Sequence, residues 1–405
     1  MGDNKRKPDI RFQGFTDDWE QRKLGDMVSF SKGSGYSKGD LKEDGTPIIL
    51  YGRLYTKYET IISEVDTFVD EKKGSVFSKG GEVIVPASGE TAEDISIASV
   101  VEKSGVLLGG DLNIITPPDE MDSAFLAISI SNGKPHNDMA KMAQGKSVVH
   151  LHNTDLEKID LPYPSHDEQR RISGFFSDLD NLITLQQRKY DKLVNVKKSM
   201  LEKMFPREGA KVPEIRFEGF TDDWEQRKLS ELITEYKETV DSDCTLPVLT
   251  SSKTEGVILQ EEHFGRKQNH DITGYNILPR NYCTYRNRSD GIDFTFNINK
   301  CCDRGIISKF YPVFCGNNND TFFISLVLNN SDDVVREIGY TCTGTGQKVL
   351  SFLDLQKMSL RVPSYEEQKN ISTYFDMFDN LITLQQRKLE KLNNIKKSML
   401  EKMFV

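Results

Sequence analysis

The sequence predicts an α+β protein in which two α/β domains with twisted sheets are separated by two long constant helices. The helices are predicted to form a coiled coil, and the whole chain a pseudo-two-fold repeat. Two repeats in the 405-residue chain support this prediction, because a short opening motif and a longer closing segment each occur twice. The inserts between the repeats are scarcely alike. The motif occupies residues 8–26 and 213–231, the inserts 27–160 and 232–359, and the closing segment 161–206 and 360–405.

The domain boundaries follow from these repeats and from a short linker. Residues 206–212, PREGAKV, contain the proline and glycine that typically end a helix. The second half of the chain therefore begins directly after the first. We assign the two domains to residues 1–163 and 207–362, and the two helices to residues 164–206 and 363–405.

The opening motif holds both tryptophans of the chain, Trp19 and Trp224. Each is followed by a short amphipathic stretch, residues 21–27 and 226–233. A large aromatic ring beside such a stretch is typical of a docking anchor, because the ring buries much apolar area. We therefore expect both tryptophans to pack in the domain cores.

Both inserts consist mainly of β-branched and aromatic runs that are bounded by glycine and proline, a pattern typical of strands. Each insert also contains one stretch near its end that is compatible with a helix. Strands are predicted in the first insert at 46–58, 81–91, 95–108 and 111–117, with a helix at 123–131. They are predicted in the second insert at 246–252, 276–287, 293–299 and 305–314, with a helix near 332–340.

The closing segment has the features of a long helix with a defined start. Ser165 with Glu168, and Ser364 with Glu367, fit the S-x-x-E capping box. Apolar residues then recur at alternating steps of four and three, which indicates a coiled-coil seam. A helix from His166 to Met204 would be roughly 58 Å long. The alternative is an amphipathic helix that lies on its own domain.

Polar residues interrupt the seam at matching places in the two copies. Gln186 and Lys197 in the first copy correspond to Gln385 and Lys396 in the second. Polar residues in a coiled-coil seam can set the register of the helices at some cost in stability. We expect these four residues to have that role.

Composition restricts the class of protein. The formal net charge is −9, which predicts weak DNA binding by this chain alone, although both closing segments carry more basic than acidic residues. There is no apolar run long enough to cross a bilayer and no secretory signal, so we expect a cytoplasmic protein. All six cysteines lie between Cys244 and Cys342 without metal-ligand spacing, and free thiols are expected.

Catalytic motifs are weak or missing. Residues 140–147, AKMAQGKS, fit a loose phosphate-binding loop, but a β-type run follows where such a loop would open a helix. The glycine-rich residues 31–39 do not match G-x-G-x-x-G. The sequence contains neither the [DN]-P-P-[YF] tetrapeptide of adenine methylases nor a paired catalytic set present in both halves. A nuclease or methylase with a divergent motif remains a rival hypothesis.

The inserts do contain polar side chains suited to DNA. Arginine can bind guanine with two hydrogen bonds, Asn or Gln can bind adenine, and Ser, Thr and Lys can contact phosphates. The strongest group is the cluster from Arg280 to Arg288. The DNA-binding candidates are Arg53, Tyr55, Lys57, Ser88, Glu90, Thr91, Lys146 and His150 in the first domain, and Ser251, Ser252, Lys253, Arg280, Arg286, Asn287 and Arg288 in the second. Each of these could equally be an ordinary solvated surface residue.

The two halves resemble the DNA-specificity subunit of Type I restriction-modification systems over essentially the whole chain. The resemblance rests on F-x-G-F-T-D-D-W-E-Q-R-K-L at the start of each half, and on P-S-x-x-E-Q and K-S-M-L-E-K-M-F at the end. It implies that the inserts are target recognition domains, each reading one half of a split, asymmetric DNA site. It also implies that the constant helices pair antiparallel, set the gap between the half-sites and dock partner subunits.

The resemblance further implies the partners and cofactors. The partners would be double-stranded DNA, two modification (methyltransferase) subunits and two restriction or translocase subunits, and no membrane. S-adenosylmethionine, ATP and Mg²⁺ would belong to these partners, and no cofactor to this non-catalytic chain. The candidates for the spacer and docking role are seam residues, namely Ile172, Phe176, Leu179, Ile183, Leu193, Met200, Ile371, Phe375, Phe378, Ile382, Leu392 and Met399. The alternative function is a coiled-coil adaptor without its own DNA readout.

Overall fold

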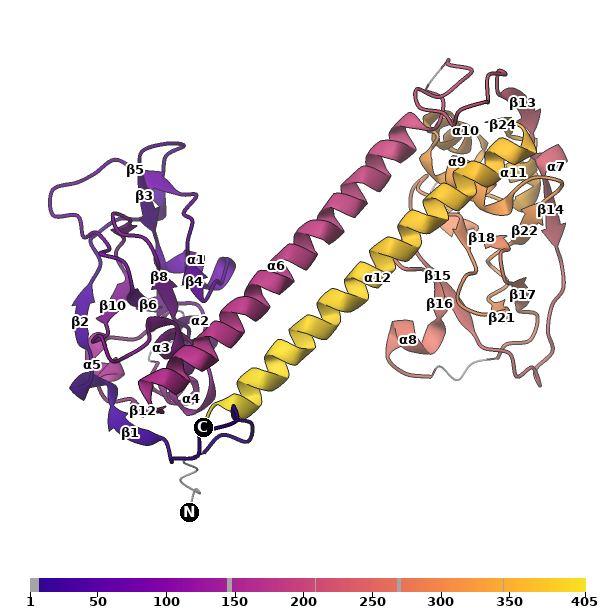
Figure 1. Ribbon diagram of the computed structural model, residues 1–405. Helices are drawn as coiled ribbons and strands as arrows, with labels where there is room; N and C mark the ends of the chain where they lie inside the picture. The colour runs from indigo at the N-terminus through magenta and orange to yellow at the C-terminus, as the bar shows by residue number, and fades with distance from the viewer. Residues whose placement is uncertain (1–6, 144–147, 208, 268–270, 345) are drawn as a thin grey trace. The chain divides into compact units, whose positions relative to one another are not determined.

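The computed structural model describes residues 7–143, 148–207, 209–267, 271–344 and 346–405. The chain forms two compact units, and Figure 1 labels most of their helices and strands. Unit 1 consists of Met1–Gln187 together with Arg387–Val405, and unit 2 consists of Arg188–Gln386. Each unit therefore contains one insert, the part of the long helix that is continuous with it, and a part of the other long helix.

Unit 1 is built on a five-stranded sheet with the order β2-β10-β6-β8-β4. The strands are β2 Ser29–Lys32, β10 Leu112–Thr116, β6 Glu82–Pro86, β8 Ser99–Val101 and β4 Ile61–Ile62. A three-stranded sheet joins β5 Phe68–Val69, β3 Thr46–Ile49 and β9 Leu107–Leu108. The helices are α1 Tyr51–Thr56, α2 Ala92–Ile95, α3 Ser123–Ile130, α4 Gly133–Met142 and α5 Asn153–Leu156.

Unit 2 repeats the centre of this plan with a four-stranded sheet of order β14-β22-β18-β20. Its strands are β14 Ile233–Tyr236, β22 Val313–Gly316, β18 Cys283–Thr284 and β20 Asn297–Ile298. Two antiparallel pairs flank it, β15 Leu249–Ser252 with β16 Gly256–Leu259, and β17 Asn276–Pro279 with β21 Arg304–Ile307. The helices are α7 Leu229–Leu232, α8 Gln260–Phe264, α9 Thr321–Asn330, α10 Asp332–Thr341 and α11 Phe352–Lys357.

The mixed α/β class and most of the predicted strands are confirmed. Helices α3 and α10 lie where helices were expected. The strand predicted at 46–58 is only half correct, because β3 ends at Ile49 and residues from Tyr51 form α1. Helix α9 was missed, since its residues 323–328 are all buried and an apolar run without polar alternation does not distinguish helix from strand.

The opening motif forms a short strand in both units, and a helical turn follows it at Leu24–Asp26 in unit 1 and at α7 in unit 2. In unit 1, β1 Glu20–Lys23 pairs antiparallel with β12 Asp160–Tyr163, directly before the long helix. In unit 2, β13 Glu225–Lys228 pairs in the same way with β24 Ser359–Val362. Trp19 and Trp224 are 3 % and 2 % exposed and belong to the two main cores, which confirms that they are anchors.

The closing segments form long helices, as predicted. Helix α6 runs from His166 to Lys203 and α12 from Tyr365 to Met403. The capping boxes are only partly formed. The Glu367 N–H donates to Ser364 Oγ at 3.4 Å, but the carboxylates of Glu168 and Glu367 accept hydrogen bonds from arginines of the opening motif. A charged partner from a distant segment replaces the local backbone contact because it offers two charge-assisted bonds.

The helices run antiparallel within each unit. In unit 1, Phe176 of α6 contacts Phe404 after α12, with ring centroids 6.0 Å apart, and Asp180 pairs with Lys396. The beginning of α6 therefore lies beside the end of α12.

Unit 2 has the same arrangement. Phe375 contacts Phe205 at 6.1 Å, and Asp379 pairs with Lys197. The lysines that interrupt the predicted seam thus form ion pairs between the two helices. The alternative prediction, in which each helix lies only on its own domain, is therefore incomplete. Among the described residues, no helix is long and apolar enough to span a membrane.

Candidate functional site

Each of the two inserts contains a junction of three chain segments, and the same pattern of backbone hydrogen bonds holds both junctions although the inserts are unlike in sequence. In unit 1 the junction is centred on Ala87, whose N–H donates to Asp111 O at 2.8 Å. Its carbonyl oxygen accepts from Leu151 N–H at 3.0 Å. Two short paired strands continue from this point, β7 Ser88–Gly89 and β11 Val149–His150. Three segments far apart in the sequence are thereby fixed to one another.

In unit 2 the equivalent residue is Asn287. Its N–H donates to Phe310 O at 2.9 Å, and its carbonyl accepts from Leu350 N–H at 3.0 Å. The paired strands here are β19 Arg288–Ser289 and β23 Lys348–Val349. The backbone frame is therefore shared between the units, while the side chains that it presents are different.

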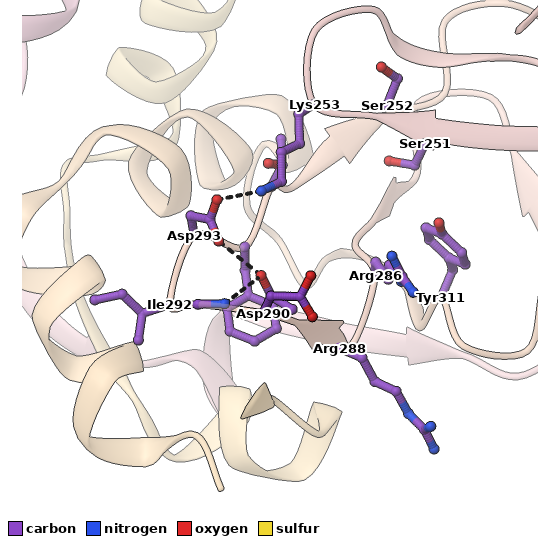
Figure 2. Close-up of a pocket in the computed structure, with 13 residues that line it drawn as sticks. Ser251, Ser252, Lys253, Arg286, Arg288, Asp290, Ile292, Asp293 and Tyr311 are labelled. Atoms are coloured by element: carbon purple, nitrogen blue, oxygen red, sulfur yellow. Dashed lines mark hydrogen bonds and ion pairs between the residues drawn. The ribbon is translucent and has the colours of Figure 1, made fainter. Parts of the chain in front are cut away.

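The junction of unit 2 borders a pocket of about 600 Å³ (Figure 2). The hairpin β15–β16 supplies one wall, and the segment around β19 supplies another. Five predicted DNA-binding residues come together here, although they lie in two separate parts of the sequence. They are Ser251, Ser252, Lys253, Arg286 and Arg288.

Acidic side chains balance part of the charge in this pocket. Lys253 forms an ion pair with Asp293, and Ser289 Oγ donates to the same carboxylate at 2.9 Å. Both contacts hold the pKa of Asp293 below its ordinary value, and the contact with Lys253 has the larger effect. Lys253 is therefore partly neutralised. On the opposite wall, Asn297 Nδ2 donates to Ser251 Oγ at 2.8 Å and thereby orients this hydroxyl.

The arginines of the pocket differ from Lys253 because no carboxylate pairs with them among the described residues. The side chains of Arg286 and Tyr311 lie next to each other in Figure 2. Arg288 stacks on the ring of Phe310, with its guanidinium carbon 4.7 Å from the ring centroid. Two exposed arginines of the pocket thus each lie beside an aromatic ring, a combination suited to nucleic acid.

Phe310 and Tyr311 were missed as site residues in the sequence. They lie in the connection between β21 and β22, where unit 1 has Gly109, Gly110 and Asp111. The only signal was a pair of aromatic residues between two strands, which usually indicates core packing. Phe310 is instead 40 % exposed.

Two other members of the predicted cluster lie differently. Arg280 does not line the pocket, since it pairs with Asp303 at 2.8 Å and donates to Lys300 O at 2.9 Å. Asn287 is half-buried, and its side-chain oxygen has no hydrogen-bond partner in the described part of the chain. Its main contribution is the backbone junction.

The basic candidates of unit 1 are held by acidic neighbours. Arg53 on α1 has a side chain only 9 % exposed, and it pairs with Asp66 at 2.6 Å and Glu59 at 2.8 Å. Lys57 also pairs with Asp66, at 3.0 Å. Lys57 and Arg53 lower the pKa of Asp66 to about 2. Arg53 is therefore placed as a structural cation rather than as an available base reader.

The remaining candidates of unit 1 lie at its junction or beside it. Ser88 Oγ is 3.1 Å from His150 Nδ1, across the β7–β11 pair. Glu90 is exposed, and Thr91 caps α2 by accepting from Asp94 N–H at 3.1 Å. Tyr55 is half-buried, and this burial raises its pKa. Lys146 lies outside the described residues, as do the other residues of 144–147 in the loose phosphate-binding motif.

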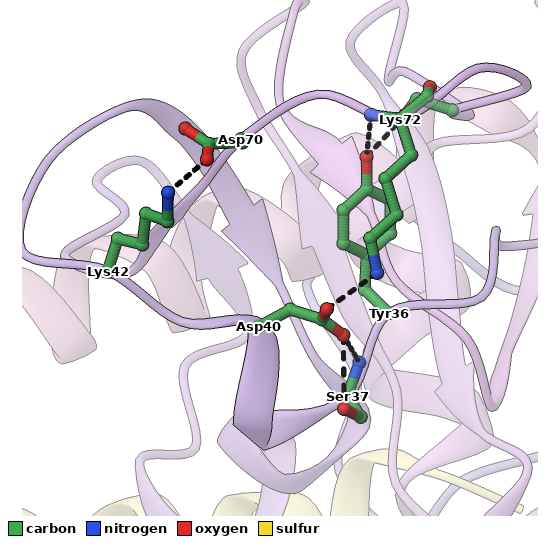
Figure 3. Close-up of polar contacts among 7 residues, drawn as sticks. Tyr36, Ser37, Asp40, Lys42, Asp70 and Lys72 are labelled. Carbon is green, nitrogen blue, oxygen red and sulfur yellow. Dashed lines mark hydrogen bonds and ion pairs between the residues drawn. The ribbon is translucent and has the colours of Figure 1, made fainter.

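A polar network orders the glycine-rich loop that begins near residue 31 (Figure 3). The Lys72 ammonium lies 4.6 Å from the centroid of the Tyr36 ring and pairs with Asp40 at 2.6 Å. Asp40 also accepts from the Ser37 N–H at 2.8 Å. The contact with Lys72, and to a smaller extent that with Ser37, lowers the pKa of Asp40 to about 2. The loop is therefore fixed at its base.

The predicted seam residues face the interior of their own units. Five of the twelve are buried, namely Ile172, Phe176, Leu179, Ile371 and Phe375, and the other seven are half-buried. Apolar residues off the seam are exposed instead. They occur at equivalent places in the two copies of the closing segment, Leu182 and Leu185 in α6 and Leu381 and Leu384 in α12.

No group of His, Cys, Asp or Glu side chains is arranged to hold a metal ion in the described ranges. The pocket instead offers hydrogen-bond donors with aromatic support.

Comparisons with known proteins agree with this picture. The family description "Type I restriction modification DNA specificity domain" matches residues 16–195 and again residues 221–394. The specificity subunit of the Type I restriction enzyme MjaVIII from Methanocaldococcus jannaschii is 22 % identical, over 95 % of this chain and 91 % of that protein. The putative MjaX specificity subunit of the same organism is 24 % identical, over 95 % and 92 %.

The fold is also similar to a solved structure. The crystal structure of the Type I restriction-modification S subunit from M. genitalium has a TM-score of 0.58 and 12 % sequence identity. The match covers 98 % of this chain and 99 % of that one. The two family matches together cover most of the sequence and fall on the two duplicated halves. The chain therefore belongs to the family of Type I restriction-modification DNA specificity subunits.

Proposed function

We propose that this chain recognises a bipartite, asymmetric DNA site, with one half-site read by each unit, and that it scaffolds a Type I restriction-modification complex. The observation that carries the proposal is the shared junction at Ala87 and Asn287. One backbone frame displays Ser88, Gly89 and Asp111 in unit 1, but Arg288, Ser289 and Phe310 in unit 2. A constant frame with unlike side chains suits two readers of different sequences.

The charge distribution supports recognition within a complex. Several of the basic DNA-binding candidates are already paired with carboxylates, as Lys253 and Arg53 are. Non-specific affinity depends on cations that are free to neutralise phosphates. The chain alone should therefore bind DNA weakly, and partner subunits would supply much of the phosphate contact.

The exposed leucines support the assembly role. Leu182 and Leu185 in α6 recur as Leu381 and Leu384 in α12, within the identical sequence DNLITLQQRK. Contiguous exposed apolar side chains mark interaction surfaces. The same surface presented twice suits two copies of one partner, which we propose is the modification subunit. S-adenosylmethionine, and with restriction subunits ATP and Mg²⁺, would be bound by these partners.

The test is a selection of binding sites from a random duplex library. The chain assembled with its modification subunit should enrich a motif with two fixed parts and an unspecified gap. A hybrid in which residues 27–160 come from another family member should change one part and leave the other unchanged. Absence of any enriched motif would favour the coiled-coil adaptor instead.

A second assay addresses the enzymatic alternative. Purified chain alone, incubated with DNA and labelled S-adenosylmethionine or with Mg²⁺, should neither methylate nor cleave. Turnover by the isolated chain would contradict the non-catalytic role.

A further inference from the structure

We propose that Arg288 reads a guanine of the half-site bound by unit 2, through the O6 and N7 atoms on the major-groove edge. Phe310 is the positioning residue, whose ring orders the Arg288 guanidinium before DNA binds. This inference rests on the DNA-reading function proposed above. It singles out one arginine among several that the sequence alone does not distinguish.

The first step of the argument is the availability of the guanidinium edge. Guanidinium groups are planar and carry five N–H donors along their edges. Arg280 and Arg304 use these edges on Asp303 and Glu238, at 2.8 and 2.5 Å. The guanidinium carbon of Arg288 instead lies over the Phe310 ring, and no carboxylate pairs with Arg288 within the described ranges. Its donors therefore remain available to a ligand.

The second step is preorganisation. Phe310 and Arg288 are held by the same backbone junction, because Asn287 N–H donates to Phe310 O at 2.9 Å and Asn287 directly precedes Arg288. Arg288 is also the partner of Val349 in the β19–β23 pair. Both members of the stack are thus fixed at their backbones. A side chain that is already ordered loses less conformational entropy when it binds.

The third step is the choice of guanine over phosphate. A planar fork matches the two acceptors of guanine with two parallel hydrogen bonds, and this pairing discriminates strongly among bases. Lysine contacts a phosphate equally well as a point charge. Hydroxyl groups can also contact phosphates, and the pocket supplies those of Ser251 and Ser252 on its opposite wall, whereas Lys253 is already paired with Asp293. Arg288 is therefore the group best suited to the base edge.

The equivalent position in unit 1 makes the inference specific to one half-site. Ser88 occupies the place of Arg288, and its hydroxyl lies 3.1 Å from His150 Nδ1. Asp111 occupies the place of Phe310 in the backbone junction. Among the described residues of unit 1, the junction thus has no counterpart of the arginine–phenylalanine contact. The two half-sites should differ at the corresponding base.

The experiment uses the complex of the chain with its modification subunit and measures base preference at every position of the selected motif. Arg288→Ala should reduce discrimination for guanine at one position of one half-site by roughly 10- to 100-fold. Arg288→Lys should retain the affinity for non-specific DNA and the salt dependence, yet lose the same preference. The other half-site serves as an internal control and should not change.

Variants of the ring test the positioning role. Phe310→Ala should weaken the preference for the same guanine. Phe310→Tyr should keep the wild-type preference, because a tyrosine ring supports the guanidinium as well as a phenylalanine ring does. Arg280→Ala is the matched control, since Arg280 is an exposed arginine of the same cluster that already pairs with Asp303. It should leave the base preference unchanged.

Several results would overturn the inference. An equal loss across all DNA sequences in Arg288→Ala, with a smaller salt dependence, would assign Arg288 to a phosphate. An unchanged guanine preference, or a motif whose half-site for unit 2 has no guanine, would also refute it. If Phe310→Ala lowered preference throughout the half-site, Phe310 would be structural only. A wild-type complex that selects no motif would instead refute the DNA-reading function itself.

Discussion

Arg11 in the opening motif and Glu168 in the first turn of α6 form a two-pronged salt bridge, with Nε and Nη2 each 2.6 Å from a carboxylate oxygen. Arg216 and Glu367 repeat it in unit 2, at 2.7 Å for both bonds. Both glutamates are 1 % exposed. The contact joins the start of each half to the start of its long helix.

Removal of Arg11 should destabilise unit 1 strongly. Arg11→Met leaves the Glu168 carboxylate buried without its charged partner, which should lower the free energy of unfolding by about 3 kcal/mol. The double variant Arg11→Met/Glu168→Leu should recover much of this loss, because no buried charge remains. Denaturant unfolding of the four proteins in this cycle measures the effect.

The control for this cycle is Arg22→Met. Arg22 pairs with Glu20, and both side chains are more than half exposed, so the expected loss is less than about 1 kcal/mol. A loss in Arg11→Met no larger than in this control would show that the buried salt bridge does not stabilise the unit.

The ion pairs between the helices predict charge-reversal rescue. Asp180 and Lys396 are 31 % and 24 % exposed in unit 1. Asp180→Lys places two cations side by side and should lower the unfolding midpoint. Adding Lys396→Asp should restore most of it, because the pair is re-formed with reversed charges. No rescue in thermal unfolding of the double variant would mean that the pairing does not stabilise the helix contact.

The tryptophan anchors should depend on ring size rather than on a hydrogen bond. The indole N–H of Trp224 is buried and has no hydrogen-bond partner within the described residues. Trp224→Phe should therefore cost only about 1–2 kcal/mol, against about 3–5 kcal/mol for Trp224→Ala. Equal losses in the two variants, measured by denaturant unfolding, would indicate that the N–H makes a contact essential to the core.

The network around Asp40 predicts a pH dependence in the loop of Figure 3. Lys72 and Ser37 lower the pKa of Asp40 from its usual 3.8 to about 2. A carboxyl group with a lowered pKa stabilises the folded loop above its unfolded pKa, and this stabilisation is lost as the pH falls from about 4 toward 2. NMR titration of the Asp40 carboxyl should show the low pKa.

The variant Lys72→Met is the control for this titration. It removes the largest cause of the shift, so the pKa of Asp40 should rise toward 3.8. An unchanged pKa in Lys72→Met would show that the ion pair does not form in solution.

The exposed leucines predict the stoichiometry of assembly. Leu182→Ser combined with Leu185→Ser should weaken binding of one modification subunit, whereas the stability of the chain should change by less than about 0.5 kcal/mol. The matched variant in Leu381 and Leu384 should weaken binding of the other copy. Mass measurement of the assembled complex distinguishes one bound partner from two.

Thr184→Ala is a suitable control, because this exposed residue lies between the two leucines of α6. Two bound partners in both leucine variants at wild-type affinity would exclude these surfaces as docking sites.

Local sequence rules succeeded where neighbouring residues decide the structure and failed where distant residues compete. The seam from Ile172 onward predicts α6 because helical periodicity is a property of the segment itself. Glu168 fits a capping box in sequence, yet its carboxylate bonds to Arg11, 157 residues away. A partner that far along the chain leaves no local pattern. The exposure of Leu182 was missed for a related reason, since only packing shows which side of the helix is covered.

The sequence by itself determined the duplicated plan, the two tryptophan anchors, the long helices and the family. All of these are carried by repeats and periodic patterns that do not depend on contacts. Only the tertiary structure distinguished Arg280 from Arg288, because both are exposed arginines in one short stretch. Folding places a carboxylate beside Arg280 and an aromatic ring under Arg288. Which hydrogen-bond donors stay free for DNA is decided by these neighbours, and they come from other loops of the domain.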